Sequence, residues 1–221
     1  MKKRKKVLFL TFGIVILLII VASATSQYWG KLSFKTQNTK GKFFKINLLG
    51  EPAAKYELTP GDSFTIEPVI ENLGTEDICC FITIRMRRVS NNTPAFSLSI
   101  YDPDYWQFIK QENFEREDKN MCTLIYAYSY YKGGYSQGVN LRSLQMEILS
   151  PGLSTPKLTD RMTLSVGLTD FSMFDNDDVN VVVSGIGVAL SQLGDISTDP
   201  ESVWGLYLTM NGDDEDEYTD F

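Results

Sequence analysis

"ELTPGDSFTIEPVIENLGTEDICCFITIRM" (residues 57–86) decides the fold class, because its apolar residues alternate with polar ones as they do along half-buried β-strands. A turn at Pro60-Gly61 precedes the first run, in which Thr65 and Glu67 lie on the polar face. In the second run the even positions from Ile78 to Met86 form one apolar face. A repeat of two residues predicts strands rather than helices.

The rest of the chain continues this pattern of short apolar runs between turn residues, which is typical of all-β sandwiches and barrels. A short helix is predicted within 101–117, where Asp102 or Asp104 can cap the first turn. We therefore expect an all-β fold, with one β-sandwich domain over residues 25–211. The candidate strands are 31–36, 42–49, 63–71, 78–89, 96–101, 122–131, 143–149, 161–169, 179–190 and 206–210.

The N-terminus has the three parts of a secretory signal peptide, and these predict a hydrophobic helix over residues 1–24. MKKRKK is basic, the run from Val7 to Val21 is largely apolar, and Ala22-Ser23-Ala24 fits a cleavage site. A retained membrane anchor is the alternative, but 15 residues at about 1.5 Å each fall short of a hydrocarbon core of about 30 Å. We expect a signal peptidase to recognise Ala22 and Ala24, and the product to be secreted or held at the cell surface. Contact with the membrane is then limited to the uncleaved signal segment.

The charge balance argues against nucleic acid as a partner. The chain has 21 basic and 28 acidic residues and no histidine. Residues 1–24 hold five of the basic residues and no acidic ones, so 16 basic residues remain against 28, a net charge of −12. The last ten residues (212–221) are strongly acidic, and we expect a disordered, solvated tail there.

The absence of histidine excludes Ser-His-Asp and Cys-His catalysis and the H-E-x-x-H zinc motif. A carboxylate pair, a lysine base or an all-oxygen metal site would remain for an enzyme. "DNDD" (175–178) lacks the spacing of a calcium loop, so a polar turn is the simpler interpretation. We expect no catalytic residues, no cofactor and no metal.

The sequence leaves two alternatives open for the state of its three cysteines and two for the role of a row of tyrosines. Cys79 and Cys80 are adjacent on a predicted strand and should point to opposite faces, and Cys122 is the third. An exported chain can hold one disulfide among them, or all three can be buried or unpaired thiols. The row Tyr126, Tyr128 and Tyr130 can be a sugar-stacking platform or, more commonly, a sheet face that packs against a neighbour.

Several short motifs follow one another along the chain: the signal pattern, Pro60-Gly61, Asn72-Leu73-Gly74, Trp106, Tyr130-Tyr131, Gly138, and a late apolar strand followed by Trp204. In this order, they resemble the camelysin and TasA group of proteins secreted by Gram-positive bacteria through a dedicated signal peptidase. The resemblance implies a jelly-roll-like β-sandwich whose copies assemble into extracellular biofilm matrix fibres. It also implies that the N-terminal strand of one subunit completes the sheet of the next.

In this chain the segment from Thr25 to Thr36 is the predicted assembling strand, because Tyr28, Leu32 and Phe34 repeat with a period of two. A homo-oligomeric fibre is the expected state. The alternatives are a cell-surface adhesin or carbohydrate-binding module and, less favoured, an enzyme. Some members of the family have been described as metalloproteases, but no histidine is available here as a ligand. A glycoside hydrolase with a carboxylate pair would be the other enzyme.

Overall fold

The computed structural model describes residues 28–30, 32–38, 44–49, 56–58, 60–90, 92–116, 119–132, 135–136, 139–140, 143–166 and 179–211. The predicted signal helix (1–24) and the predicted acidic tail (212–221) lie outside the described residues. So does the "DNDD" turn.

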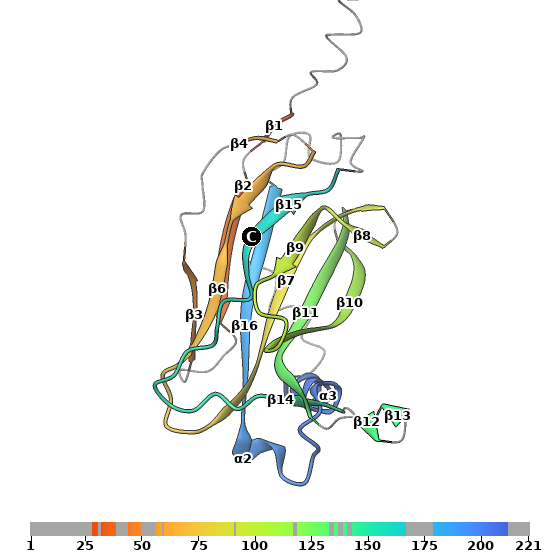
Figure 1. Cartoon of the computed structure of the whole chain (residues 1–221). Coiled ribbons are helices and arrows are strands. Elements are labelled where there is room, and N and C mark those ends of the chain that lie inside the picture. The colour runs from red at the N-terminus through yellow and green to blue at the C-terminus, as the bar shows by residue number, and fades with distance from the viewer. Residues whose placement is uncertain are drawn as a thin grey trace, which may run out of the picture.

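The larger sheet has seven strands: five follow the order β10-β11-β7-β16-β2, and β14 and β8 pair with β11 and β7 respectively (Figure 1). Every pairing in it is antiparallel except that of β2 with β16, which is parallel. β2 and β10 therefore form its two edges. The strands are β2 (Leu32–Asn38), β7 (Ile78–Ser90), β8 (Thr93–Pro94), β10 (Trp106–Arg116), β11 (Lys119–Lys132), β14 (Ser143–Met146) and β16 (Val179–Ala189).

The smaller layer combines two short antiparallel groups, β5-β15-β9 and β3-β6. Only Ile66 separates β5 from β6, and the N–H groups of Thr155 and Leu158 bond to carbonyl oxygens of β6 at 2.9 and 3.0 Å. These bonds join the two groups into one layer. The strands are β3 (Phe44–Leu49), β5 (Ser63–Thr65), β6 (Glu67–Asn72), β9 (Phe96–Ile100) and β15 (Thr159–Leu164).

Two further pairs complete the strands of the described residues. β1 (Tyr28–Gly30) pairs with β4 (Tyr56–Leu58), and β12 (Tyr135–Ser136) pairs with β13 (Val139–Asn140). The described part of the chain is thus mostly strand, and the all-β class is confirmed.

The main core lies between the two layers. The even positions of β7 from Ile78 to Met86 are all buried in it, as the alternation predicted. The smaller layer contributes Phe64, Ile66, Ile70, Phe96, Leu158, Met162 and Leu164 to the same cluster. Burial of this apolar surface is the main term that stabilises a fold of this size.

A second apolar cluster covers the opposite face of the larger sheet. There Cys79 and Phe81 of β7 pack with Val203 and Trp204 of α3 (Pro200–Asn211), and Leu193 of α2 (Leu190–Leu193) adds to them. The rings of Phe81 and Trp204 meet edge to face with centroids 5.3 Å apart. β7 is therefore buried on both faces, which explains why its odd positions also begin with apolar residues.

The strand predicted at 206–210 is wrong, because these residues lie in α3. The start of the helix is well specified locally. Asp199 accepts a hydrogen bond from the Ser202 N–H at 2.9 Å, and Pro200 suits the first turn of a helix. The helix then buries Val203 and Trp204 against the sheet. This packing of the whole segment outweighs the strand-like pattern of residues 206–210.

The helix predicted within 101–117 is also wrong, because most of that segment is β10. The expected capping residue Asp102 does begin a turn, with its carbonyl accepting hydrogen bonds from Tyr105 and Trp106 at 3.2 and 3.0 Å. The turn ends there, and β10 then pairs with β11 from Trp106 to Arg116. Its register shifts between Phe108 and Lys110. Pairing along a long neighbour outweighs the weak helix propensity of this segment.

Candidate functional site

A polar groove of about 330 Å³ lies where β5 and β6 meet β15, on the face of the smaller layer that points away from the core. β5 alternates between the exposed Ser63 and Thr65 and the buried Phe64, so its polar side chains face the groove. The lining residues are Ser63, Phe64, Thr65, Glu67, Lys157, Asp160 and Arg161.

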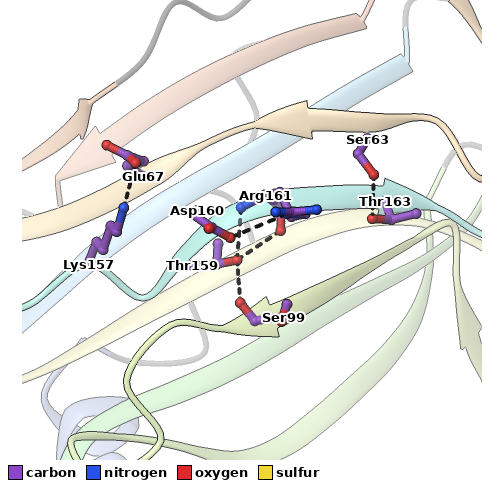
Figure 2. Close-up of polar contacts among 8 residues, drawn as sticks. All are labelled: Ser63, Glu67, Ser99, Lys157, Thr159, Asp160, Arg161 and Thr163. Carbon is purple, nitrogen blue, oxygen red and sulfur yellow. Dashed lines mark hydrogen bonds and ion pairs between the residues drawn. The ribbon is translucent and has the colours of Figure 1, made fainter.

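Three polar side-chain pairs lie in a row along this groove (Figure 2). Lys157 Nζ lies 2.7 Å from Glu67 Oε1, and the hydroxyls of Ser63 and Thr163 lie 2.9 Å apart. Both of these pairs join segments about 90 or more residues apart in the sequence. The third pair, Asp160 and Arg161, is 3.6 Å apart on β15 itself.

An irregularity in β15 brings the third pair to the surface. The register of β15 against β9 shifts between Thr159 and Met162, both of which are buried. The Thr159 hydroxyl lies 2.6 Å from the Ser99 carbonyl oxygen and accepts a hydrogen bond from the Arg161 N–H at 3.2 Å. The two consecutive residues between the buried positions, Asp160 and Arg161, are therefore both outside the core.

Lys157 connects the groove to an exposed aromatic ring. Its ammonium nitrogen lies 4.2 Å from the centroid of the Tyr101 ring, which is 56% exposed. The hydrogen bond to Glu67 raises the pKa of Lys157, so the ammonium group stays charged at neutral pH. Carboxylates, cations, hydroxyls and one aromatic ring together can bind a ligand that both donates and accepts hydrogen bonds.

The predicted assembling segment (25–36) is divided between two strands. Tyr28 lies in β1, opposite Leu58 of β4, whereas Leu32 and Phe34 lie in β2, paired with Val179 and Val181. Thr25 to Gln27 lie outside the described residues. The structure therefore places Leu32 and Phe34 on one strand, at the edge of the larger sheet, and separates Tyr28 from them.

The three cysteines are free and buried, so the structure has the second of the two alternatives and no disulfide. Cys122 of β11 is paired with Met86, which lies six residues along β7 from Cys80. At about 3.3 Å per residue this separation is roughly 20 Å, far beyond the limit of about 7 Å between disulfide-linked Cα atoms. Cys79 faces the second cluster, under α3.

The tyrosine row packs in the core and does not form an exposed platform. Tyr126 and Tyr128 are buried between the layers, and only Tyr130 is half-buried. The Tyr105 ring stacks on Tyr128 at 6.1 Å, and Phe108 meets Tyr126 edge to face at 5.5 Å. Packing against a neighbouring strand, the commoner of the two alternatives, is thus confirmed.

Among the described residues, no group of three or more acidic or cysteine side chains is arranged to hold a metal ion. Within the same residues, no helix combines the length and apolar character needed to cross a membrane. The predicted recognition residues Ala22 and Ala24 lie outside the part of the chain that the structure describes.

Comparisons with known proteins found no match to this chain among protein-family models, curated proteins or solved structures.

Sequence reasoning singled out no residue of the groove as a site. The polar face of the first strand, with Thr65 and Glu67, was visible in the alternation. Their partners come from a distant segment with no motif: Arg161 lies opposite Thr65 in the register of β15 against β5, and Lys157 forms an ion pair with Glu67.

Proposed function

We propose that the protein is exported and assembles into extracellular matrix fibres by exchanging its N-terminal strand between copies. The observation that supports this most is the position of β2. It lies at the edge of the larger sheet and is paired with β16 alone among the strands of that sheet. β2 includes Leu32 to Thr36, the longer of the two strand parts of the predicted assembling segment.

Strand exchange is physically plausible at this edge because it conserves contacts. When β2 leaves, the backbone groups of β16 that face β2, between Val179 and Gly185, lose their partners, while the pairing of β16 with β7 remains. A second copy's β2 has the same sequence and restores the same bonds. Exchange of an identical element is a common route to oligomers, and repeated in one direction it gives an open fibre.

Export supports the same proposal. Residues 1–24 carry the complete signal pattern, and cleavage after Ala24 makes Leu32 the eighth residue of the cleaved chain. Only residues 25–31 then precede β2, and among them β1 is paired with β4, so an exchanged β2 takes β1 out of that pairing. A strand near a free end can be donated without threading a loop through another chain.

The proposal also includes the jelly-roll-like arrangement that the resemblance implies. Its support is that strands adjacent in the larger sheet are often distant in sequence, such as β7 beside β16 and β16 beside β2. Crossovers of this kind connect the two layers of Greek-key and jelly-roll sandwiches.

Electron microscopy of protein purified after secretion tests the proposal, and the proposal predicts regular fibres. Excess synthetic peptide of residues 28–38 should shorten them, because it occupies the edge of β16 without offering a domain for the next copy to join. A peptide with the same residues in scrambled order is the control. Fibres of unchanged length in excess peptide would contradict strand exchange, and a protein that stays monomeric under all conditions would contradict assembly.

A further inference from the structure

We propose that the polar groove between β5, β6 and β15 is a binding site for a neutral carbohydrate. The groove involves no residue of β2, so this inference is separate from fibre assembly. Its volume, about 330 Å³, is at the small end of ligand pockets and suits a short stretch of sugar rings at an open surface.

The side chains that line the groove match the hydrogen bonds of sugar hydroxyls. A hydroxyl donates one hydrogen bond and accepts others, so it is best held by acceptors and donors that lie side by side. Glu67 and Lys157 provide such a neighbouring pair at 2.7 Å, and Asp160 with Arg161 provides another on the next strand. The Ser63 hydroxyl adds a third polar contact at the end of the row (Figure 2).

Tyr101 supplies an aromatic surface at the margin of the groove. Its ring is more than half exposed although its backbone is fixed by a hydrogen bond from its N–H to the Leu158 carbonyl oxygen at 2.9 Å. The Lys157 ammonium, which also holds Glu67, covers one face of this ring at 4.2 Å from its centre, so a sugar would stack on the opposite face. Amphipathic rings of this kind stack on the apolar face of a sugar while polar neighbours bind its hydroxyls.

The balance of acidic and basic side chains in the groove favours a neutral carbohydrate over a charged one. Two carboxylates and two cations line the groove, so the site has no net charge to attract an anionic or a cationic ligand. The chain as a whole carries a formal charge of −7, which repels anionic polymers at long range. Glu67 of β6 is already paired with Lys157, which precedes β15, so the side chains of this ion pair need little further ordering on binding.

The full chain is expressed, and the purified protein is titrated with neutral hexasaccharides of glucose and of N-acetylglucosamine. Binding is measured by calorimetry and by changes in backbone amide NMR shifts. An oligogalacturonate serves as the anionic probe. We expect one neutral probe to bind saturably and to shift amides of residues 63–67 and 157–163. Lys157→Met and Tyr101→Ala should each weaken binding roughly tenfold, as expected for the loss of one charged hydrogen bond or one stacking contact.

Matched variants elsewhere on the surface keep the test specific. Lys110→Met removes the cation of a similar exposed ion pair, Lys110–Glu112 at 2.6 Å, and Tyr105→Ala removes another exposed tyrosine. Both should bind within about twofold of the unchanged protein. The inference is overturned if no neutral probe binds at millimolar concentration, if the anionic probe binds more tightly, or if Lys110→Met weakens binding as much as Lys157→Met.

Discussion

The side-chain amide of Asn72 donates a hydrogen bond to the carbonyl oxygen of Leu149 at 2.8 Å, which ties the end of β6 to a segment 77 residues later. The same amide also donates to the Glu76 carbonyl oxygen at 2.9 Å, and its oxygen accepts from the Gly74 N–H at 3.0 Å. Asn72 is completely buried, so these bonds have no water to replace them. The Asn-x-Gly motif thus fixes the turn between the two layers.

Replacing Asn72 by Ala should therefore destabilise the domain by about 2–4 kcal/mol, because the three hydrogen bonds of a fully buried side chain are lost. Urea unfolding followed by circular dichroism measures this. Asn120→Ala, at an exposed asparagine, is the control and should change stability by about 0.5 kcal/mol or less. Equal effects of the two substitutions would contradict a special role for the motif.

Trp204 anchors α3 on the outer face of the larger sheet. Its ring packs against Phe81, and its side chain is 5% exposed. Trp204→Ala should destabilise the protein by about 3–5 kcal/mol through the lost contacts and the cavity. Leu208→Ala on the same helix removes a side chain that is 39% exposed and should have a much smaller effect. A Trp204→Ala protein as stable as the Leu208→Ala protein would show that α3 does not depend on this packing.

The buried thiols should make stability fall at alkaline pH. Burial raises the pKa of Cys79 and of Cys122 from 9.0 to about 11, and it raises that of Cys80 as well. Between pH 9 and 11 the unfolded chain releases thiol protons that the folded chain keeps, so the unfolding free energy decreases with rising pH. Urea unfolding at pH 7, 9 and 11 measures the trend.

The Cys122→Ala protein is the control for the alkaline effect and should show a shallower decrease between pH 9 and 11. The folded protein should also react with a thiol reagent only slowly at pH 8, and all three cysteines should react in denaturant. Rapid labelling of the folded protein, or stability that does not change up to pH 11, would contradict this description of the thiols.

Export predicts a defined new N-terminus. Mass spectrometry of the protein recovered outside the cell should find a chain that begins at or near Thr25, because Ala22 and Ala24 fit the small-residue cleavage pattern. Replacing Ala24 by a bulky residue such as Phe should block cleavage and keep the protein in the membrane fraction. If the protein with its natural Ala24 is found in the membrane fraction with an intact N-terminus, the anchor alternative is favoured instead.

The sequence predicted those strands in which apolar and polar residues alternate as one face is buried. The predicted secondary structure was wrong where tertiary contacts outweigh the local sequence pattern. β7 was predicted almost to its ends, because its even positions from Ile78 to Met86 face the core. The segment around Gln111 and Glu112 has helix-forming residues, yet it lies at a sheet edge where pairing with β11 decides its structure. No local feature of the sequence reports that pairing.

The candidate groove was less predictable than the fold for the same reason. Glu67 and Lys157 are 90 residues apart and are brought together only by the layer in which β5, β6 and β15 meet. Similarly, the alternation predicted the opposite orientations of Cys79 and Cys80, but the burial of Cys79 depends on α3, where a strand was expected at 206–210.

Disulfide trapping between β2 and β16 tests strand exchange most directly, because Gln37 is paired with Ser184 in the parallel register. Two proteins are mixed, one with Gln37→Cys and the other with Ser184→Cys, so a bond between these positions can form only between chains. The native thiols are buried and react slowly, so they can stay in place. A mixture of Lys110→Cys and Ser184→Cys proteins is the control.

If β2 is exchanged, fibres assembled from the mixture and oxidised should give covalent dimers on a non-reducing gel, and the control mixture should not. A chain carrying both Gln37→Cys and Ser184→Cys, oxidised before assembly, should form its bond internally and fail to polymerise. Fibres that form from this internally bonded protein, with no cross-linked dimer in the mixture, would contradict the proposal that β2 of one copy completes the sheet of the next.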